Sequence, residues 1–113
     1  MLSGEIKKPE DIPEGDFRRR LPRFQPGTFD KNLELVKELE KIAKQKGCTT
    51  AQLAIGWVKH LSKKDGNPEI IPIPGSTTEA RILENSKTVT LTTGEIAEIE
   101  KILKSFPVEG GRY

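Results

Sequence analysis

The 113-residue sequence is poor in cysteine, histidine and aromatic side chains, and each shortage excludes a class of protein. Because Cys48 is the only cysteine, no intramolecular disulfide can form. With His60 as the only histidine, no cluster of histidine and cysteine ligands can hold a metal ion. The sequence also lacks an apolar run of the length of a signal peptide or a membrane span. We therefore expect a soluble, cytoplasmic protein without a structural disulfide or metal.

The sequence also has no large excess of positive or negative charge, because it contains 19 lysines and arginines and 17 aspartates and glutamates. Binders of nucleic acid or membranes usually carry a concentrated basic surface. The sharpest basic cluster, at residues 17–24, has acidic residues directly before it. We expect neither a nucleic-acid nor a membrane partner. The length and a hydrophobic content of 34% fit one small domain with a lean core.

Proline and glycine interrupt residues 1–27, which predicts an extended loop with no helix or strand of its own. Helices are predicted from residue 28 onward. The first has Thr28 as its cap and ends at Gly47, and the second follows a capping box formed by Thr49 and Gln52. Apolar residues cover more than half the circumference of this second helix, so we expect it to be buried on more than one side.

A single segment, residues 70–74, has the β-branched apolar character of a buried parallel strand. Two more helices follow it. The third is predicted to have a capping box of Ser76 and Glu79 and to run to about Lys87, and the fourth to open at residues 92–95 and end before Pro107. One strand cannot satisfy its own backbone groups. Either the chain is nearly all helical, or the partners of the strand lie elsewhere.

The start of the third predicted helix has the chemistry of an anion site. A helix N-terminus presents unpaired backbone N–H groups and partial positive charge, which bind phosphate. A glycine allows close approach, three hydroxyl groups add donors, and an arginine one turn later adds a fixed charge. An acid and an amide one turn further on match the edge of an adenine. The residues are Gly75, Ser76, Thr77, Thr78, Arg81, Glu84 and Asn85. The simpler interpretation is that Ser76 and Glu79 only cap a helix.

Residues 72–85, PIPGSTTEARILEN, resemble the cofactor segment of the aldo-keto reductases. Residues 50–58 look like the last-but-one barrel helix of that family, and residues 91–99 look like its C-terminal accessory helix. Residues 1–4 and 16–24 are similar to the segment after the seventh barrel strand in microbial and fungal members. The resemblance therefore spans essentially the whole sequence.

The resemblance implies an α/β fold, of which this chain is the C-terminal portion of a (β/α)₈ barrel. Residues 70–74 would be its eighth strand, and the chain, residues 1–113, a partial reductase domain that is mostly helical as it stands. The family's catalytic Asp, Tyr, Lys and His would lie before Met1, so the chain receives no catalytic residue. The resemblance further implies that residues 75–78, with Arg81, bind the 2′-phosphate of NADP(H) and that Glu84 and Asn85 bind its adenine. The complete enzyme would reduce an aldehyde or ketone, and this fragment alone would be inactive.

A second hypothesis of another class stays open. The chain would then be a stand-alone small helical module for interaction or regulation, derived from the same family. Its apolar helix faces, especially around Trp57, would need a partner, which could be another copy of the chain or an intact reductase.

Overall fold

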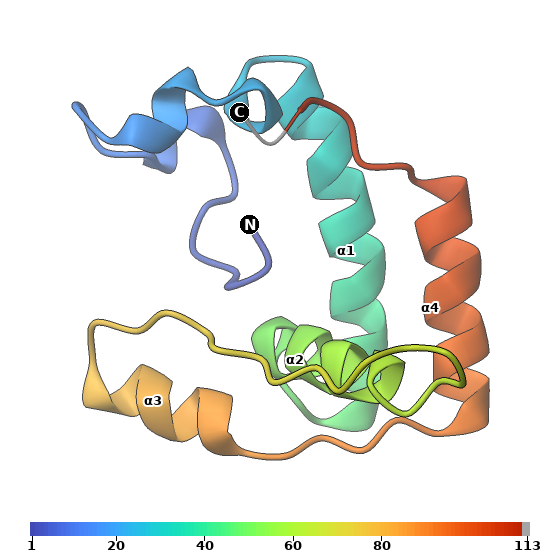
Figure 1. Ribbon diagram of the computed structural model, residues 1–113. Helices are drawn as coiled ribbons and strands as arrows, with labels where there is room; N and C mark the ends of the chain where they lie inside the picture. Colours follow the sequence, from blue (N-terminus) through green and yellow to red (C-terminus); the bar gives the residue numbers. More distant parts are fainter. Residues whose placement is uncertain (112–113) are drawn as a thin grey trace.

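The computed structural model describes residues 1–111, so Arg112 and Tyr113 at the end of the predicted domain lie outside the described residues. Three short 3-10 turns come first, η1 (Pro9–Asp11), η2 (Phe17–Arg20) and η3 (Pro22–Phe24). Four helices follow, α1 (Thr28–Lys46), α2 (Thr50–Leu61), α3 (Glu79–Ser86) and α4 (Thr93–Ser105). Helices α1 and α4 lie side by side, α2 packs across one end of α1, and α3 contacts α2 on the side away from α4 (Figure 1).

Local capping chemistry determines most of the helix boundaries. At the start of α2, Thr49 Oγ1 accepts from the Gln52 amide and Gln52 Oε1 accepts from the Thr49 amide, both at 3.1 Å. The same reciprocal box opens α4, with Thr92 and Glu95 as partners. Gly47 ends α1 at a φ of 73°, a left-handed conformation that favours glycine. These three predicted boundaries are confirmed.

Two predicted caps are wrong. Gly27 precedes α1, and Thr28 is already its first residue, with no side-chain cap at that end. Thr78, not Ser76, caps α3, because the Thr78 hydroxyl accepts from the Arg81 amide at 3.4 Å. The Ser76 hydroxyl instead donates to the Thr78 carbonyl at 3.0 Å. Helix α3 therefore starts at Glu79 and ends at Ser86, one residue before the predicted end.

The core is built mainly on one face of α1. Its buried residues come from α1, α2 and α4, and they are Leu35, Leu39, Ile42, Ala43, Leu53 and Ile99. A second, smaller cluster joins the start of α1 to the N-terminal segment through Ile6, Ile12 and Phe29. Burial of apolar side chains in these two clusters holds α1 at the centre of the fold.

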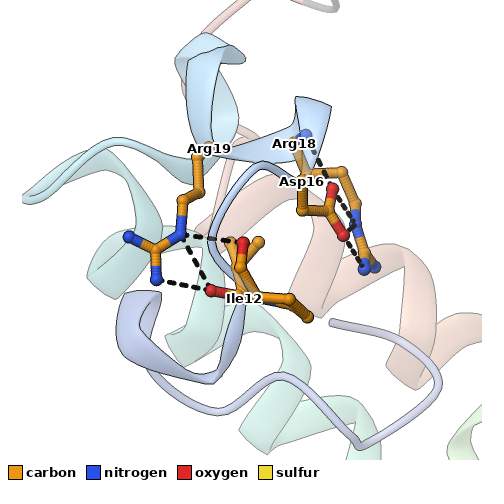
Figure 2. Close-up of polar contacts among 5 residues, drawn as sticks. Ile12, Asp16, Arg18 and Arg19 are labelled. Carbon is orange, nitrogen blue, oxygen red and sulfur yellow. Dashed lines mark hydrogen bonds and ion pairs between the residues drawn. The ribbon is translucent and has the colours of Figure 1, made fainter.

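The N-terminal segment is more ordered than the predicted loop. The Arg19 guanidinium donates from Nε to the carbonyl oxygens of Ile12 at 2.8 Å and Pro13 at 3.1 Å (Figure 2). Beside it, the Arg18 guanidinium donates to the Asp16 carboxylate, with 2.6 Å between Nη2 and Oδ2 (Figure 2). These contacts hold the 3-10 turns together, which proline and glycine content did not predict.

The C-terminal tail returns to the start of α1. Asn32, a buried residue on α1, donates from Nδ2 to the Glu109 carbonyl at 2.9 Å and accepts from the Glu109 amide at 2.8 Å. The Lys31 ammonium pairs with the Glu109 carboxylate at 2.8 Å. Arg23 Nε also donates to the Gly110 carbonyl at 3.1 Å. These hydrogen bonds fix the tail to residues that precede it by 77 or more positions in the sequence.

The strand predicted at residues 70–74 is not formed. Residues 1–111 contain no β-strand, so this segment has no neighbour with which to form a ladder. Ile71 and Ile73 are consequently 75% and 91% exposed, although their composition is that of buried residues. The part of the chain that the structure describes is therefore helical, and the α/β class does not apply to these residues taken by themselves.

Helix α2 is packed on more than one side, as predicted, because it contacts both α1 and α3 and none of its residues is exposed. Gln52, Leu53 and Gly56 are buried, while Trp57 and Val58 are only half-buried. An apolar cavity of about 450 Å³ lies among α1, α2, α4 and the first residues of the chain. Leu53 lies in the core with residues of α1 and α4. On other sides of α2, the Gln52 side chain donates to the Glu84 carbonyl of α3, and Gly56 lies against Val89. Within residues 1–111, no helix combines the length and apolar character that crossing a membrane requires.

Candidate functional site

The predicted anion site lies at the N-terminus of α3. Pro72 and Pro74 cannot donate backbone hydrogen bonds, and the extended Thr78 residue brings this segment directly into the helix. The first backbone amides of an α-helix have no partner within the helix. In α3, the backbone amide of Arg81 donates to the Thr78 hydroxyl. The start of α3 thus keeps amides that can donate to an anion.

Arg81 is the main positive charge of this site. It is the third residue of α3, so its side chain starts from the first turn of the helix. Its guanidinium forms an ion pair with Glu5, which lies 76 residues earlier in the N-terminal segment. The Arg81 side chain is 30% exposed, whereas that of Glu5 is 63% exposed. Both groups are therefore accessible to a solute.

A shallow groove of about 300 Å³ runs between α2, the segment before α3 and α3 itself. It brings together two of the predicted residues, Ser76 and Asn85. Lys59 on α2 adds a second positive charge, and the other lining residues are Ile55, Pro72, Pro74, Ile82 and Ser86. The groove has apolar walls with a few polar groups, a composition suited to a flat base with a polar edge.

The remaining predicted residues lie around this groove without lining it. Gly75, Thr77 and Thr78 are exposed, and Glu84 is half-buried. The Glu84 carbonyl accepts from Gln52 Nε2 at 3.0 Å, which ties α3 to α2. A Cβ placed on Gly75 would have no heavy atom within 4 Å, so the space beside this backbone is open. The structure leaves room for a ligand at the position where a glycine was predicted to permit close approach.

The first turn of α3 offers amide donors and the charge of Arg81, and the groove beside α3 offers Lys59 and the amide of Asn85. Arg81 and the first amides of α3 suit a phosphate, and Asn85 in the groove can both donate to and accept from a heterocycle. The arrangement can bind and orient a ligand. It brings together no nucleophile and general base, and in the described range of residues no three His, Cys, Asp or Glu side chains gather in a way that could hold a metal ion.

The histidine and the cysteine of the chain, His60 and Cys48, lie in surroundings that do not favour catalysis. His60 lies against Trp57 on α2, with 5.8 Å between ring centroids. Burial raises the pKa of the Cys48 thiol, an effect that the Lys46 charge opposes and the Glu95 charge reinforces. A raised pKa lowers the fraction of reactive thiolate.

Sequence reasoning missed three residues of the site. Glu5 could not be found, because nothing local relates it to an arginine 76 residues away. Gln52 was interpreted only as half of a capping box, yet its side chain also donates to α3. Lys59 could have been found, because it follows Ile55 by four residues and therefore lies on the same face of α2.

The chain is similar in sequence to known proteins along nearly its whole length. The sequence model of the aldo/keto reductase family matches residues 1–104. Aldo-keto reductase yakc of Schizosaccharomyces pombe, whose name specifies NADP(+), is 41% identical over 114 residues, which cover 99% of this chain and 32% of that protein. A Saccharomyces cerevisiae protein provisionally named as a pyridoxal reductase is 39% identical over 122 residues, covering 100% of this chain and 35% of that protein.

Aldo-keto reductase str7 of Strobilurus tenacellus is 32% identical over 114 residues, covering 99% of this chain and 32% of its own length. The chain thus spans about a third of the length of these curated relatives. No solved structure matches the chain.

Proposed function

Because the chain belongs to the aldo/keto reductase family, we propose that it supplies the part of an NADP(H)-dependent reductase that holds the 2′-phosphate and the adenine of the cofactor. Residues 75–78 and Arg81 bind the phosphate in this proposal, and Glu84 with Asn85 binds the adenine. The NADP(+) in the name of the Schizosaccharomyces pombe relative supports the choice of cofactor.

The observation that carries the proposal is the position of Arg81. Arg81 belongs to the first turn of α3, where the helix leaves its first amides unpaired. A 2′-phosphate is a dianion that such a site favours, whereas a 2′-hydroxyl gains little from the same charge. The open space at Gly75 and the groove beside Ser76 and Asn85 fit the rest of the adenosine moiety.

The proposed reaction belongs to the complete barrel. NADPH supplies a hydride to the carbonyl carbon of an aldehyde or ketone, and a protein acid supplies the proton to its oxygen. The residues of this chain bind and orient the adenosine end of the cofactor, away from the transferred hydride. We therefore expect no carbonyl reduction by the 113-residue chain alone.

Titration of the isotope-labelled 113-residue chain with NADP(+) and with NAD(+) tests the cofactor site by NMR. We expect NADP(+) to shift the amide resonances of residues 75–85 and to bind more tightly than NAD(+). Arg81→Ala should weaken NADP(+) binding about 10-fold or more, since hydrogen bonds to charged groups are worth about 1.5–3 kcal/mol. Arg20→Ala, an exposed arginine in η2, is the matched control and should leave the affinity unchanged.

A chimaera measures the same site in an active enzyme. This chain would replace the matching third of the Schizosaccharomyces pombe relative, to which it is 41% identical. We expect the chimaera to oxidise NADPH with an aldehyde, and Arg81→Ala to raise the KM for NADPH with little change in kcat. An active chimaera whose KM for NADPH is unaffected by Arg81→Ala would contradict the assignment of the phosphate site.

A second candidate function is favoured by the exposed apolar residues. Ile71 and Ile73 lie in an extended segment without a β-strand partner, and an apolar cavity adjoins α2. Exposed apolar surface of this kind promotes association. In this alternative the chain is an interaction module that associates with itself or with an intact reductase. Sedimentation of the purified chain distinguishes the two, because the module should associate as its concentration rises and the cofactor segment need not.

A further inference from the structure

The ion pair between Glu5 and Arg81 places a carboxylate where the proposed phosphate would bind. The side chains of Glu5 and Arg81 are both accessible to solvent, and their ion pair joins two segments that are 76 residues apart in the sequence. One guanidinium cannot give its best donors to a carboxylate and to a phosphate at the same time. The two anions therefore compete for Arg81.

The position of Glu5 is fixed by its neighbours in the chain. Gly4 adopts a φ of 78° in a turn whose amide donates to the Met1 carbonyl at 2.8 Å. Ile6, the next residue, is buried in the cluster with Ile12 and Phe29. The Asp11 carboxylate then accepts from the Lys7 amide at 2.9 Å. Glu5 is thus held between a turn and a buried anchor.

A second arginine lies within electrostatic reach of Glu5. The pKa of Arg18 is raised chiefly by its hydrogen bond to Asp16, and the negative charge of Glu5 adds to this increase. Glu5 therefore pairs with Arg81 and lies within electrostatic reach of Arg18, whose own charge is paired with Asp16. An anion that replaced the Glu5 carboxylate would meet the guanidinium of Arg81.

From this geometry we propose that Glu5 is an internal competitor for the phosphate site, holding Arg81 in the nucleotide-free protein and yielding it when a 2′-phosphorylated nucleotide binds. The inference rests on the proposed function and adds a residue that sets the selectivity for the 2′-phosphate. Glu5 lowers the affinity for NADP(+) by competition and by repulsion of the dianion. NAD(+), which has no 2′-phosphate, does not need to displace it.

The test compares wild type, Glu5→Gln and Glu14→Gln as full 113-residue chains. Glu14 is an exposed glutamate of the same N-terminal segment, so its variant controls for the loss of one negative charge. NMR titrations measure the affinities for NADP(+) and NAD(+), and the Nε–Hε resonance of Arg81 reports on its partner without any nucleotide. We expect Glu5→Gln to shift that resonance and to strengthen NADP(+) binding about twofold to fivefold, as for the loss of an exposed ion pair, with NAD(+) binding unchanged.

Three results would overturn the proposal. If wild type binds NADP(+) and Glu5→Gln binds it equally well, Glu5 does not compete, while the proposed cofactor site stands. An equal gain from Glu14→Gln would mean that only net charge matters. If neither wild type nor Glu5→Gln binds NADP(+), the proposed cofactor site fails together with this inference, and the Arg81 resonance still reports whether the ion pair exists.

Discussion

Asp16 and Arg18 form the best-defined side-chain pair in the N-terminal segment (Figure 2). The hydrogen bonds from Arg18 lower the pKa of Asp16 to about 2, from an ordinary value of 3.8. Because the folded pKa is the lower one, the pair stabilises the fold fully above about pH 4 and loses its effect as the pH falls toward 2. We expect a carbon-detected NMR titration of the Asp16 carboxyl to give a midpoint near 2.

The variant Arg18→Gln should return the Asp16 midpoint to near 4, the ordinary range for aspartate. Arg20→Gln removes a positive charge two residues after Arg18. Because Arg20 makes no hydrogen bond to Asp16, this variant should leave the titration midpoint of Asp16 low. A wild-type midpoint near 4 would show that Arg18 does not hold the Asp16 carboxylate in solution.

The packing of α2 against the segment before α4 depends on one glycine. A Cβ on Gly56 would lie 2.8 Å from the backbone carbonyl oxygen of Val89, which is closer than non-bonded atoms allow. Gly56→Ala must therefore displace the 88–91 segment. We expect it to lower the free energy of unfolding by about 1–3 kcal/mol, a typical cost of overpacking. Urea unfolding followed by far-ultraviolet circular dichroism measures the change.

Gly94→Ala is the matched control, because Gly94 is also a helical glycine and a Cβ there would have no heavy atom within 4 Å. Alanine costs less backbone entropy than glycine in a helix, so this variant should be as stable as wild type or more stable, by at most about 1 kcal/mol. If Gly56→Ala proves equally stable, the close approach of Val89 does not constrain α2.

The molecule as a whole exposes apolar residues that its own elements do not cover. Among the described residues, Ile73 is the most exposed large apolar residue, and nearby Ile71 is also largely exposed. We expect Ile73→Asp to reduce concentration-dependent association, measured by sedimentation equilibrium. The free energy of unfolding should change by less than about 0.5 kcal/mol, since the side chain contributes little to the core.

Phe17→Asp replaces another exposed apolar residue, in η2 of the N-terminal segment, and should leave association unchanged. If Ile73→Asp and Phe17→Asp reduce association equally, apolar exposure in general drives it. If neither changes it, the 70–74 segment is not an association surface.

Features determined by a few neighbouring residues could be predicted from the sequence. The capping boxes at Thr49 and Thr92 and the glycine that ends α1 are of this kind, and the structure has them where they were expected. At α3 two residues could serve as the cap, and the sequence pattern did not distinguish Thr78 from Ser76. The choice depends on backbone angles that each residue alone does not determine.

Features that need a distant partner could not be predicted in the same way. Composition at residues 70–74 describes a strand that belongs in a sheet, but pairing requires neighbours that residues 1–111 do not provide. The candidate site shows the same limit. Its residues on α3 were found together because they are adjacent in the sequence, whereas Glu5 reaches Arg81 only through the fold.

The clamp between Asn32 and Glu109 has a consequence for the order of events during synthesis. A ribosome makes the α1 segment long before residue 109, so the amide of Asn32 must remain hydrated or find temporary partners until the tail emerges. Its burial without Glu109 would cost about 1–3 kcal/mol. The N-terminal end of α1 can therefore reach its final packing only after residue 109 has left the ribosome, well after the rest of α1 has been made.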